Sequence, residues 1–294
     1  MGNKDWFLII LLGTLWGASF LFVEILLDLI NPFLIVYLRV SIASILLLLF
    51  LYFSKIKFKL SKKITFNLFI MALLNNIIPF LFIAYGQKTT TGGLASILNA
   101  NTSLITIILA AMFIPNEKLT LNRFVGVIVG LLGIIIAVDY QSFLTIYDES
   151  FGKILILFAT VSYAFASIWA KLKLSEVPPL IAATGMLTFS TLMLSPFAVG
   201  FYLDDLLKLN FSIIFYSGIF AFLCSVVAYL LYFKILENTG AGNLLVCTII
   251  IPPASIVLNS IFLGQVISIS ELIGLLIILF GLVILDGRYK NLVK

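Results

Sequence analysis

The 294-residue chain contains no histidine. This absence excludes imidazole metal ligands, Ser-His and Cys-His nucleophile systems and imidazole proton relays. Cysteine is scarce too: Cys224 and Cys247 both stand in apolar runs, so we expect buried, reduced thiols and no disulfide framework. Charged residues make up only 11% of the chain, less than half of the roughly 25% typical of soluble domains. Most enzyme chemistry is therefore excluded, and we expect no catalytic site, metal or cofactor.

Apolar residues take the place of the missing charges. The chain is 62% hydrophobic and its mean hydropathy is +1.22, a composition that indicates a membrane protein. At about 20 residues per transmembrane helix, the chain has room for roughly ten spans and little else. Any function therefore resides within the bilayer or in the connections between the spans.

The apolar residues fall into ten segments bounded by charges or by Asn, Pro and Gly. The segments are long and rich in Leu and Ile, without the two-residue alternation of a membrane β-barrel. We therefore predict an all-α membrane protein with ten transmembrane helices. The predicted segments are 6–26, 33–53, 66–86, 92–114, 122–138, 152–172, 178–201, 211–233, 241–263 and 270–287.

The net charge of +5 is distributed in a way that predicts topology. With the N-terminus in the cytoplasm, 14 of the 18 basic residues fall in inner segments and three in outer segments, while Arg39 lies inside the second helix. Basic residues in short loops resist translocation, so this bias predicts that both termini are cytoplasmic. We expect a multi-pass protein of a bacterial-type cytoplasmic (inner) membrane with an even number of helices.

The chain repeats itself weakly at about half its length. Each half, residues 1–140 and 150–290, holds five predicted helices, so the second half enters the membrane from the opposite side. Inverted repeats of this kind are typical of secondary transporters, because two similar halves can exchange conformations around a shared site. At an offset of 148, the matches are Thr91-Gly92 with Thr239-Gly240, Glu117 with Gln265, Gly126 with Gly274, and Gly133 with Gly281.

Small residues recur at close helical spacing in the fifth predicted helix. Gly126, Gly130 and Gly133 predict that this helix and the tenth pack tightly on a neighbour.

Several short motifs resemble a known family. They are Leu15-Trp16-Gly17-Ala18-Ser19-Phe20, Pro32 followed by Leu38-Arg39, Gly93-Leu94-Ala95-Ser96-Ile97-Leu98-Asn99, and Glu117-Lys118-Leu119-Thr120 leading to Gly126 and Gly133. Their order and spacing resemble the EamA-like branch of the drug/metabolite transporter superfamily over nearly the whole chain. The resemblance implies ten helices, cytoplasmic ends, and export or exchange of small metabolites through a central cavity. Two positions depart from it: Gln265 stands where the first half has Glu117, and Glu24 stands where a basic residue is common.

Two charges, Glu24 and Arg39, lie clearly inside predicted helices, which makes them candidates for gating or coupling. Counted from the turn near Ile30, they lie about 9 and 13 Å along their helix axes, within reach of each other. We expect them to form an ion pair near the outer mouth, because either charge alone would be uncompensated. The pair is either an inert tie between two helices or, through Glu24, part of a proton-coupled gate.

Intramembrane amide and hydroxyl side chains are candidates for the transport path, because polar groups in hydrocarbon need a cavity or a partner. The alternative is that they join helices, at under about 1 kcal/mol each. The Pro252-Pro253 pair is expected to break a helix at mid-depth beside a cavity. The predicted substrate-binding residues are Trp16, Asn75, Asn76, Asn99, Asn101, Thr102, Tyr163, Trp169, Asn243 and Thr248.

Two of these aromatic residues match across the repeat. Trp16 and Tyr163 are 147 positions apart and are expected to flank one cavity, where their rings would stack on a planar or cationic ligand. Ordinary packing is the alternative, because the chain has 27 phenylalanines.

The sequence thus predicts a secondary transporter that exports small organic metabolites, above all amino acids, by alternating access. The expected partners are a small-molecule substrate, membrane lipids and, as a candidate coupling ion, protons; nucleic acid is not expected. The oligomeric state is a monomer or a homodimer. A lipid flippase and a non-transporting scaffold are the alternatives, whereas a lipid-modifying enzyme would need a nucleophile or metal ligands near an interface.

Overall fold

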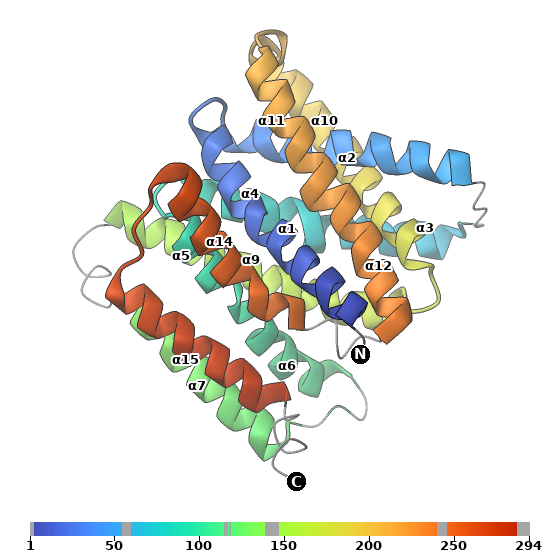
Figure 1. Cartoon of the computed structure of the whole chain (residues 1–294). Coiled ribbons are helices and arrows are strands. Elements are labelled where there is room, and N and C mark those ends of the chain that lie inside the picture. The colour runs from blue at the N-terminus through green and yellow to red at the C-terminus, as the bar shows by residue number, and fades with distance from the viewer. Residues whose placement is uncertain are drawn as a thin grey trace.

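The computed structural model describes residues 3–54, 60–114, 117, 119–138, 147–239 and 246–286, and all regular secondary structure within them is helical (Figure 1). Two short segments are π-helical and are labelled η. The elements are α1 (Asn3–Leu27), α2 (Pro32–Ser54), α3 (Lys62–Ala72), η1 (Leu73–Ile77), α4 (Ile78–Gly86), α5 (Gly92–Asn99), α6 (Asn101–Phe113), α7 (Leu121–Ala137), α9 (Tyr147–Lys173), α10 (Pro179–Leu207), α11 (Phe211–Ala221), η2 (Phe222–Val227), α12 (Ala228–Thr239), α14 (Val246–Leu263) and α15 (Ile269–Asp286).

The helices confirm an all-helical, multi-pass membrane protein. Within the described ranges, seven helical stretches are long and apolar enough to cross a bilayer, where the backbone must satisfy its own hydrogen bonds. Three shorter apolar helices fall below that length: Leu121–Ala137, Cys247–Leu263 and Ile269–Ile284. The long stretches are Asn3–Leu27, Pro32–Ser54, Lys62–Gly86, Gly92–Phe113, Ser150–Lys173, Pro179–Leu207 and Phe211–Thr239.

Polar side chains set several helix starts. Thr91, Thr120 and Asn210 precede α5, α7 and α11, and each side-chain oxygen accepts the backbone N–H three residues on. Such caps satisfy one of the unpaired N–H groups at a helix N-terminus. α5, α7 and α11 therefore each begin directly after a residue with a hydroxyl or amide side chain.

Large apolar side chains cover the outside of the bundle. Leu121, Phe201, Phe211 and Ile269 are each more than 75% exposed. On a soluble domain such residues would form an interaction surface, but on a membrane protein they face lipid tails. Their exposure agrees with the composition of the chain.

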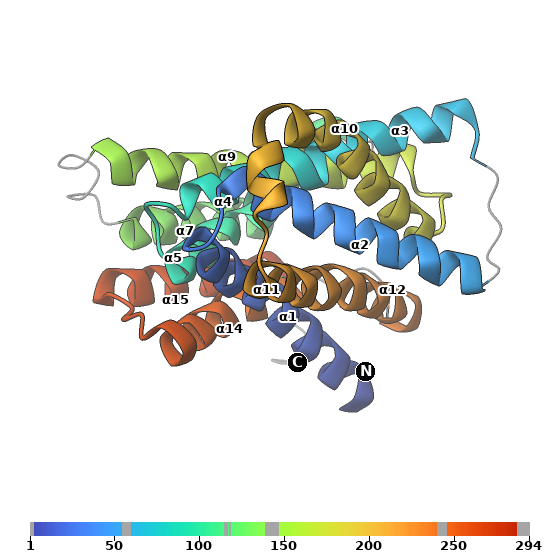
Figure 2. The same cartoon turned by 90° about the horizontal axis from the view of Figure 1, so that it is seen from above.

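The helices pack in pairs drawn from both halves of the chain. In Figures 1 and 2, α7 lies along α15 and α1 lies along α14. In the middle of the bundle α2 packs on α10, and α9 packs on α4, α5 and α6. Each half therefore buries much of its surface against the other.

Glycines allow the close approach of α7 and α15, as the sequence predicted. A β-carbon at Gly133 would lie 2.8 Å from the carbonyl oxygen of Gly274, and one at Gly281 would lie 2.8 Å from that of Gly126. These obstacles are backbone atoms, which cannot rotate away. The four glycines thus hold the two helices at backbone contact distance.

Two long helices change to π-helical geometry at matching places. η1 begins at Leu73 and η2 at Phe222, 149 positions later. Pro79 follows η1 and has no N–H to donate to Asn75, which explains a local loss of regular α-helical bonding there. No proline lies in or after η2 in its helix, so this widening has no equally simple sequence cause. Single π-helical turns often mark functional sites.

The expected helix break at Pro252-Pro253 is wrong. α14 continues as a helix from Val246 to Leu263 through both prolines. A proline removes one hydrogen bond and crowds the preceding turn, but the helix is held on both sides by packing against α1 and α5.

Candidate functional site

The predicted ion pair between Glu24 and Arg39 is wrong. Arg39 donates from Nε to Ser225 Oγ at 3.1 Å and from Nη2 to the carbonyl oxygen of Cys224 at 3.5 Å. Glu24 instead accepts from the backbone N–H of Gly92 at 2.6 Å and from the side-chain amide of Gln265. Glu24 and Arg39 lie close enough to the turn between α1 and α2 to reach each other along the helix axes, but α1 and α2 are rotated so that the two side chains point to different neighbours.

Arg39 lies deep in the bundle, with only 9% of its surface exposed. Its Cζ atom is 3.9 Å from the centre of the Phe80 ring and 4.5 Å from that of Phe220. Aromatic faces attract a cation through their quadrupole, and this attraction strengthens away from water. The arginine is therefore enclosed by two rings on one side and bonded to neutral oxygens of η2 on the other.

The titratable groups that surround this arginine carry no charge at neutral pH. They are Tyr163, Cys224 and Tyr229. Among the described residues the ion pairs are Glu117 with Arg123 and Glu117 with Lys171, so neither involves Arg39. The centre of the bundle thus holds a cation that is paired with no carboxylate of the described residues.

The first π-helical segment carries two of the predicted residues into the same region. Asn75 donates to Tyr229 Oη and to Met186 Sδ, both at 3.5 Å, and Asn76 donates to Ser190 Oγ at 3.1 Å. The Tyr163 ring centre lies 6.5 Å from that of Phe80. We name this group the central cluster; its members are Arg39, Asn75, Asn76, Phe80, Tyr163, Ser190, Phe220, Ser225 and Tyr229.

A second polar group lies where α5 meets α6. Asn101 is buried and donates to Thr160 Oγ1 of α9 at 3.4 Å. The side-chain oxygens of Asn99, Asn101 and Thr102 are buried without a hydrogen-bond partner in the described part of the chain. Buried polar atoms normally have partners, so these oxygens are candidates for contact with water or a solute.

Other predicted residues lie away from the central cluster. Trp16 packs against Tyr232, with ring centres 5.9 Å apart, and Trp169 donates to the backbone carbonyl of Asn67 at 3.1 Å, which ties α9 to α3. Thr248 is half-buried on α14. Asn243 lies outside the described residues.

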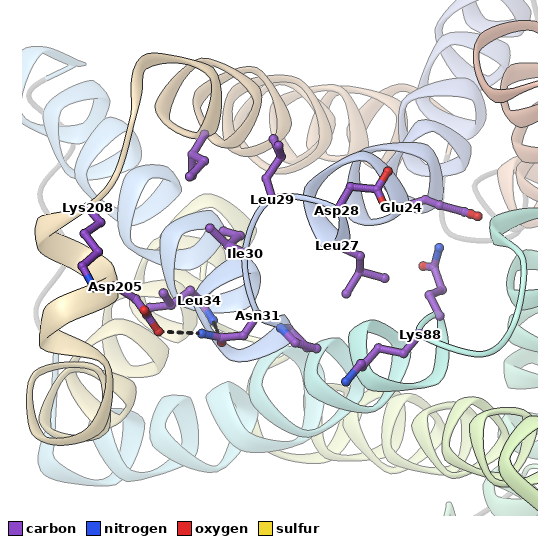
Figure 3. A pocket seen from close by; sticks show the side chains of 13 residues that line it. Glu24, Leu27, Asp28, Leu29, Ile30, Asn31, Leu34, Lys88, Asp205 and Lys208 are labelled. Atoms are coloured by element: carbon purple, nitrogen blue, oxygen red, sulfur yellow. Dashed lines mark hydrogen bonds between the residues drawn. The ribbon is translucent and has the colours of Figure 1, made fainter.

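A cavity of about 710 Å³ lies where α1, α4 and α10 end and α2 and α11 begin (Figure 3). Among the predicted site residues, Glu24 alone lines it. Figure 3 shows Glu24 and Asp28 on one side and Asp205 and Lys208 on another, with Asn31 donating to Asp205 at 3.4 Å. We call this cavity the vestibule; it is lined by Glu24, Leu27, Asp28, Leu29, Ile30, Asn31, Pro32, Leu34, Gln87, Lys88, Asp205, Lys208 and Ile213.

A group of ion pairs joins α9 to the connection between α6 and α7. Glu117 Oε1 lies 2.7 Å from Lys171 Nζ, and Glu117 Oε2 lies 2.8 Å from Arg123 Nη1. These two hydrogen bonds hold the pKa of Glu117 below its ordinary value. The carboxylate is therefore charged at neutral pH and ties three segments together.

Sequence reasoning missed several members of the central cluster. Ser225 lies 149 positions after Asn76, so the internal repeat carried a signal for it. Tyr229 and Phe220 lie in an apolar run with many aromatic residues and had no distinguishing signal.

Comparison with known proteins adds an independent observation. The EamA-like transporter family matches residues 4–138 and again residues 150–285. An uncharacterized transporter of Archaeoglobus fulgidus is 26% identical over 284 residues, covering 96% of this chain and 98% of its own. A probable amino-acid metabolite efflux pump of Salmonella typhimurium is 23% identical over 298 residues, covering 97% and 95%.

Two further relatives agree in extent. The uncharacterized inner membrane transporter YedA of Escherichia coli K12 is 26% identical over 286 residues, covering 95% of this chain and 89% of its own. A solved crystal structure shares the fold with a TM-score of 0.69 at 15% identity, covering 97% of this chain and 98% of the matched one.

Proposed function

The chain belongs to the EamA-like transporter family, and from this premise we propose that it is a secondary transporter that exports small organic metabolites, with amino acids as the first substrate class to test. The relatives carry the names of transporters, which favours transport over enzymatic chemistry. The number and orientation of the helices, the transport mechanism and the substrate are proposed in addition to family membership.

We propose that the chain forms ten spans in two inverted five-helix halves, with the three shorter apolar helices completing the set. The pattern of helix contacts supports this arrangement. We number the ten spans along the chain and replace each by the span five places further on, counting from 1 again after 10. Contacting pairs then become other contacting pairs: α1 with α14 (spans 1 and 9) becomes α9 with α6 (spans 6 and 4), α4 with α9 (spans 3 and 6) becomes α12 with α1 (spans 8 and 1), and α3 with α10 (spans 3 and 7) becomes α11 with α2 (spans 8 and 2). Pairing of this kind is what a two-fold relation between the halves produces.

Alternating access would use the two ends of the bundle in turn. The vestibule lies at the ends of α1 and α10, and the Glu117 ion pairs lie beyond the ends of α6 and α9. If the basic-residue bias sets the topology, both termini are cytoplasmic, the vestibule faces outward and the ion pairs face inward. The protein would then reside in a cytoplasmic membrane of bacterial type.

The central cluster supports a substrate with both polar and apolar parts. It combines one cation, two amides, hydroxyl groups and aromatic rings, without a carboxylate from the described chain. This chemistry suits zwitterionic metabolites such as amino acids. A similar inference comes from the relative named as a probable amino-acid metabolite efflux pump.

A lipid flippase is the alternative to a solute transporter. It would be favoured by a cavity that opens between helices toward lipid. The vestibule is instead lined by five charged residues at helix ends, Glu24, Asp28, Lys88, Asp205 and Lys208, so the solute transporter is preferred.

The observation that carries the proposal is the symmetric pairing of helices around a buried polar centre. The test is counterflow in proteoliposomes that contain the full-length protein. Vesicles preloaded with an unlabelled amino acid are diluted into the same compound in radiolabelled form, and transient accumulation of label is expected. The panel covers the twenty common L-amino acids, with protein-free vesicles as the control. Absence of accumulation for every amino acid, and for uncharged metabolites tested in the same way, would reject a transporter of this class.

A further inference from the structure

Arg39 is a buried cation that forms no ion pair within the part of the chain that the structure describes. Its side chain extends from the N-terminal half of α2 and is buried, and both of its hydrogen bonds go to neutral oxygens of η2. A cation without an anion is among the most costly groups to keep in a membrane interior, and such groups usually mark ligand or ion paths. The costly placement therefore calls for a functional reason.

The nearest intramembrane carboxylate in the sequence does not serve as the counter-charge. Glu24 is bound to Gly92 and Gln265 instead. Glu117, which forms the ion pairs of the described residues, lies outside the spans and pairs with Arg123 and Lys171. No carboxylate of the described residues forms an ion pair with Arg39, so a bound ligand is the candidate for the balancing anion.

The planar geometry and the single charge of the guanidinium favour a carboxylate as the bound anion. A guanidinium is planar and binds a carboxylate through two parallel hydrogen bonds. The central cluster holds a single arginine, which balances one negative charge and leaves a phosphate dianion half neutralised. The rings of Phe80 and Phe220 lie against the guanidinium, and Tyr163 and Tyr229 are close enough to interact with its charge. Aromatic rings of this kind can attract an ammonium or stack on an aromatic group.

The site lies below the vestibule. Leu34 lines the vestibule and precedes Arg39 by five residues on α2, which is about 7.5 Å along a helix. Ile213 lines it too and precedes Phe220 by seven residues on α11, about 10 Å. Arg39 and Phe220 thus lie about one and a half and two helical turns from the vestibule, on two helices that pack on each other.

We propose that Arg39 binds the carboxylate of the transported solute, so that the substrates are small monocarboxylates, zwitterionic amino acids among them. This inference rests on the proposed transport function and adds a substrate class and a residue to it. Phe80 and Phe220 shield the guanidinium when no carboxylate is bound.

The test compares carboxylates with their amides. The probes are L-phenylalanine, L-threonine and benzoate, each matched with its uncharged-end counterpart: L-phenylalaninamide, L-threoninamide and benzamide. Thermal unfolding of the purified full-length protein is measured with each probe. At about ten times its Kd, a carboxylate that binds is expected to raise the Tm of the wild type by about 3 °C, whereas its amide leaves the Tm unchanged.

Three variants assign the effect to Arg39. Arg39→Met is expected to lose the carboxylate shift, and Arg39→Lys is expected to keep a weaker one, with Kd raised about tenfold, because lysine retains the charge without the planar fork. Lys153→Met is the matched control: Lys153 is also a buried cation, 6% exposed, and donates to the carbonyl of Val138 at 3.1 Å, away from the central cluster. It is expected to keep the full shift.

The unliganded proteins separate binding from a purely structural role. If Arg39 is kept for a ligand, Arg39→Met unfolds at the same temperature as the wild type or higher, because the variant removes an unpaired buried charge. If the arginine only holds helices together, Arg39→Met unfolds at a lower temperature and the probes shift both proteins equally, which overturns the proposal. Where Arg39→Met does not fold, the affinity of Arg39→Lys decides.

Two further results separate this proposal from the transport function. Equal shifts by carboxylates and amides, or no shift by any carboxylate, reject the carboxylate site, while counterflow of the amides would still show a transporter. Carboxylate binding that depends on Arg39, without counterflow of any probe, would support the site and reject the transport function.

Discussion

Glu24 and Lys171 occupy matching places in the two halves, 147 positions apart, and each binds the connection that follows the fourth helical stretch of the opposite half. Lys171, near the end of α9, binds Glu117 between α6 and α7; Glu24, near the end of α1, binds Gln265 between α14 and α15. Glu117 and Gln265 are themselves 148 positions apart. We call these contacts the Glu117 latch and the Gln265 latch.

The two latches differ in chemistry. The Glu117 latch is an ion pair with two cations, whereas the Gln265 latch joins a carboxylate to a neutral amide and a backbone N–H. If both close the bundle at their own ends, their unequal strengths bias the protein between its two open states.

The Gln265 latch predicts how vestibule access responds to charge. Gln265→Glu places a second carboxylate against Glu24 and should open that end, whereas Gln265→Lys creates an ion pair and should close it. The measurement is the rate at which a membrane-impermeant maleimide labels Ile30→Cys, at a half-buried position that lines the vestibule. The native thiols, Cys224 and Cys247, are each 1% exposed and give a low background. Equal labelling rates in the two variants would contradict a closing role for the latch.

The Glu117 latch predicts a pH dependence of stability. Because Lys171 and Arg123 lower the pKa of Glu117 from its ordinary 4.5, the latch stabilises the folded state above that pH. The stabilisation is lost as the pH falls through the lower pKa of the folded state. The pairs are partly exposed, so we expect about 0.5–1 kcal/mol from the network.

The measurement is the Tm of the wild type and of Glu117→Gln between pH 6 and pH 3. The difference between them should shrink at the acid end and should also shrink in high salt. A difference that stays constant over this pH range would show that the carboxylate charge contributes nothing.

The contact between α7 and α15 predicts a steric effect. In Gly133→Leu the new side chain meets the backbone of Gly274 and Ile278, so the helices must separate, at a cost of about 1–3 kcal/mol. Gly200→Ala is the matched control, because nothing lies within 4 Å of its β-carbon position. The control should be neutral or stabilised by up to about 1 kcal/mol. Thermal unfolding of both purified variants checks the prediction, and equal Tm values would show that the close approach is not required.

The unpartnered oxygens between α5 and α6 predict a separation of stability from transport. Asn99→Ala removes an oxygen that has no partner among the described residues, so the stability should change little while counterflow falls. Asn101→Ala breaks the contact with Thr160 and should lower stability by about 1 kcal/mol. Tm and counterflow are measured on both variants. Normal counterflow in Asn99→Ala would remove this residue from the transport path.

The candidate site was predictable in part. Asn75, Asn76 and Arg39 were predicted because polar groups in hydrocarbon need a partner, and the structure places all three in the central cluster. Trp16, Tyr163 and Trp169 were predicted as aromatic faces. Tyr163 lies in the central cluster, whereas Trp16 contacts Tyr232 and Trp169 donates to the carbonyl of Asn67. Composition cannot distinguish these cases, because an aromatic ring suits packing and ligand contact equally well.

The sequence by itself determined the helices, their apolar surfaces and the internal repeat, because a run of about 20 apolar residues satisfies its backbone only as a helix in lipid. Tertiary structure alone decided which side chains meet. Glu24 and Arg39 lie on consecutive helices and are opposite in charge, yet they bind Gln265 and η2, because helix rotation and crossing set side-chain direction. The same packing placed η2 of the second half against Arg39 of the first half, a contact between residues 185 and 186 positions apart that no local pattern contains.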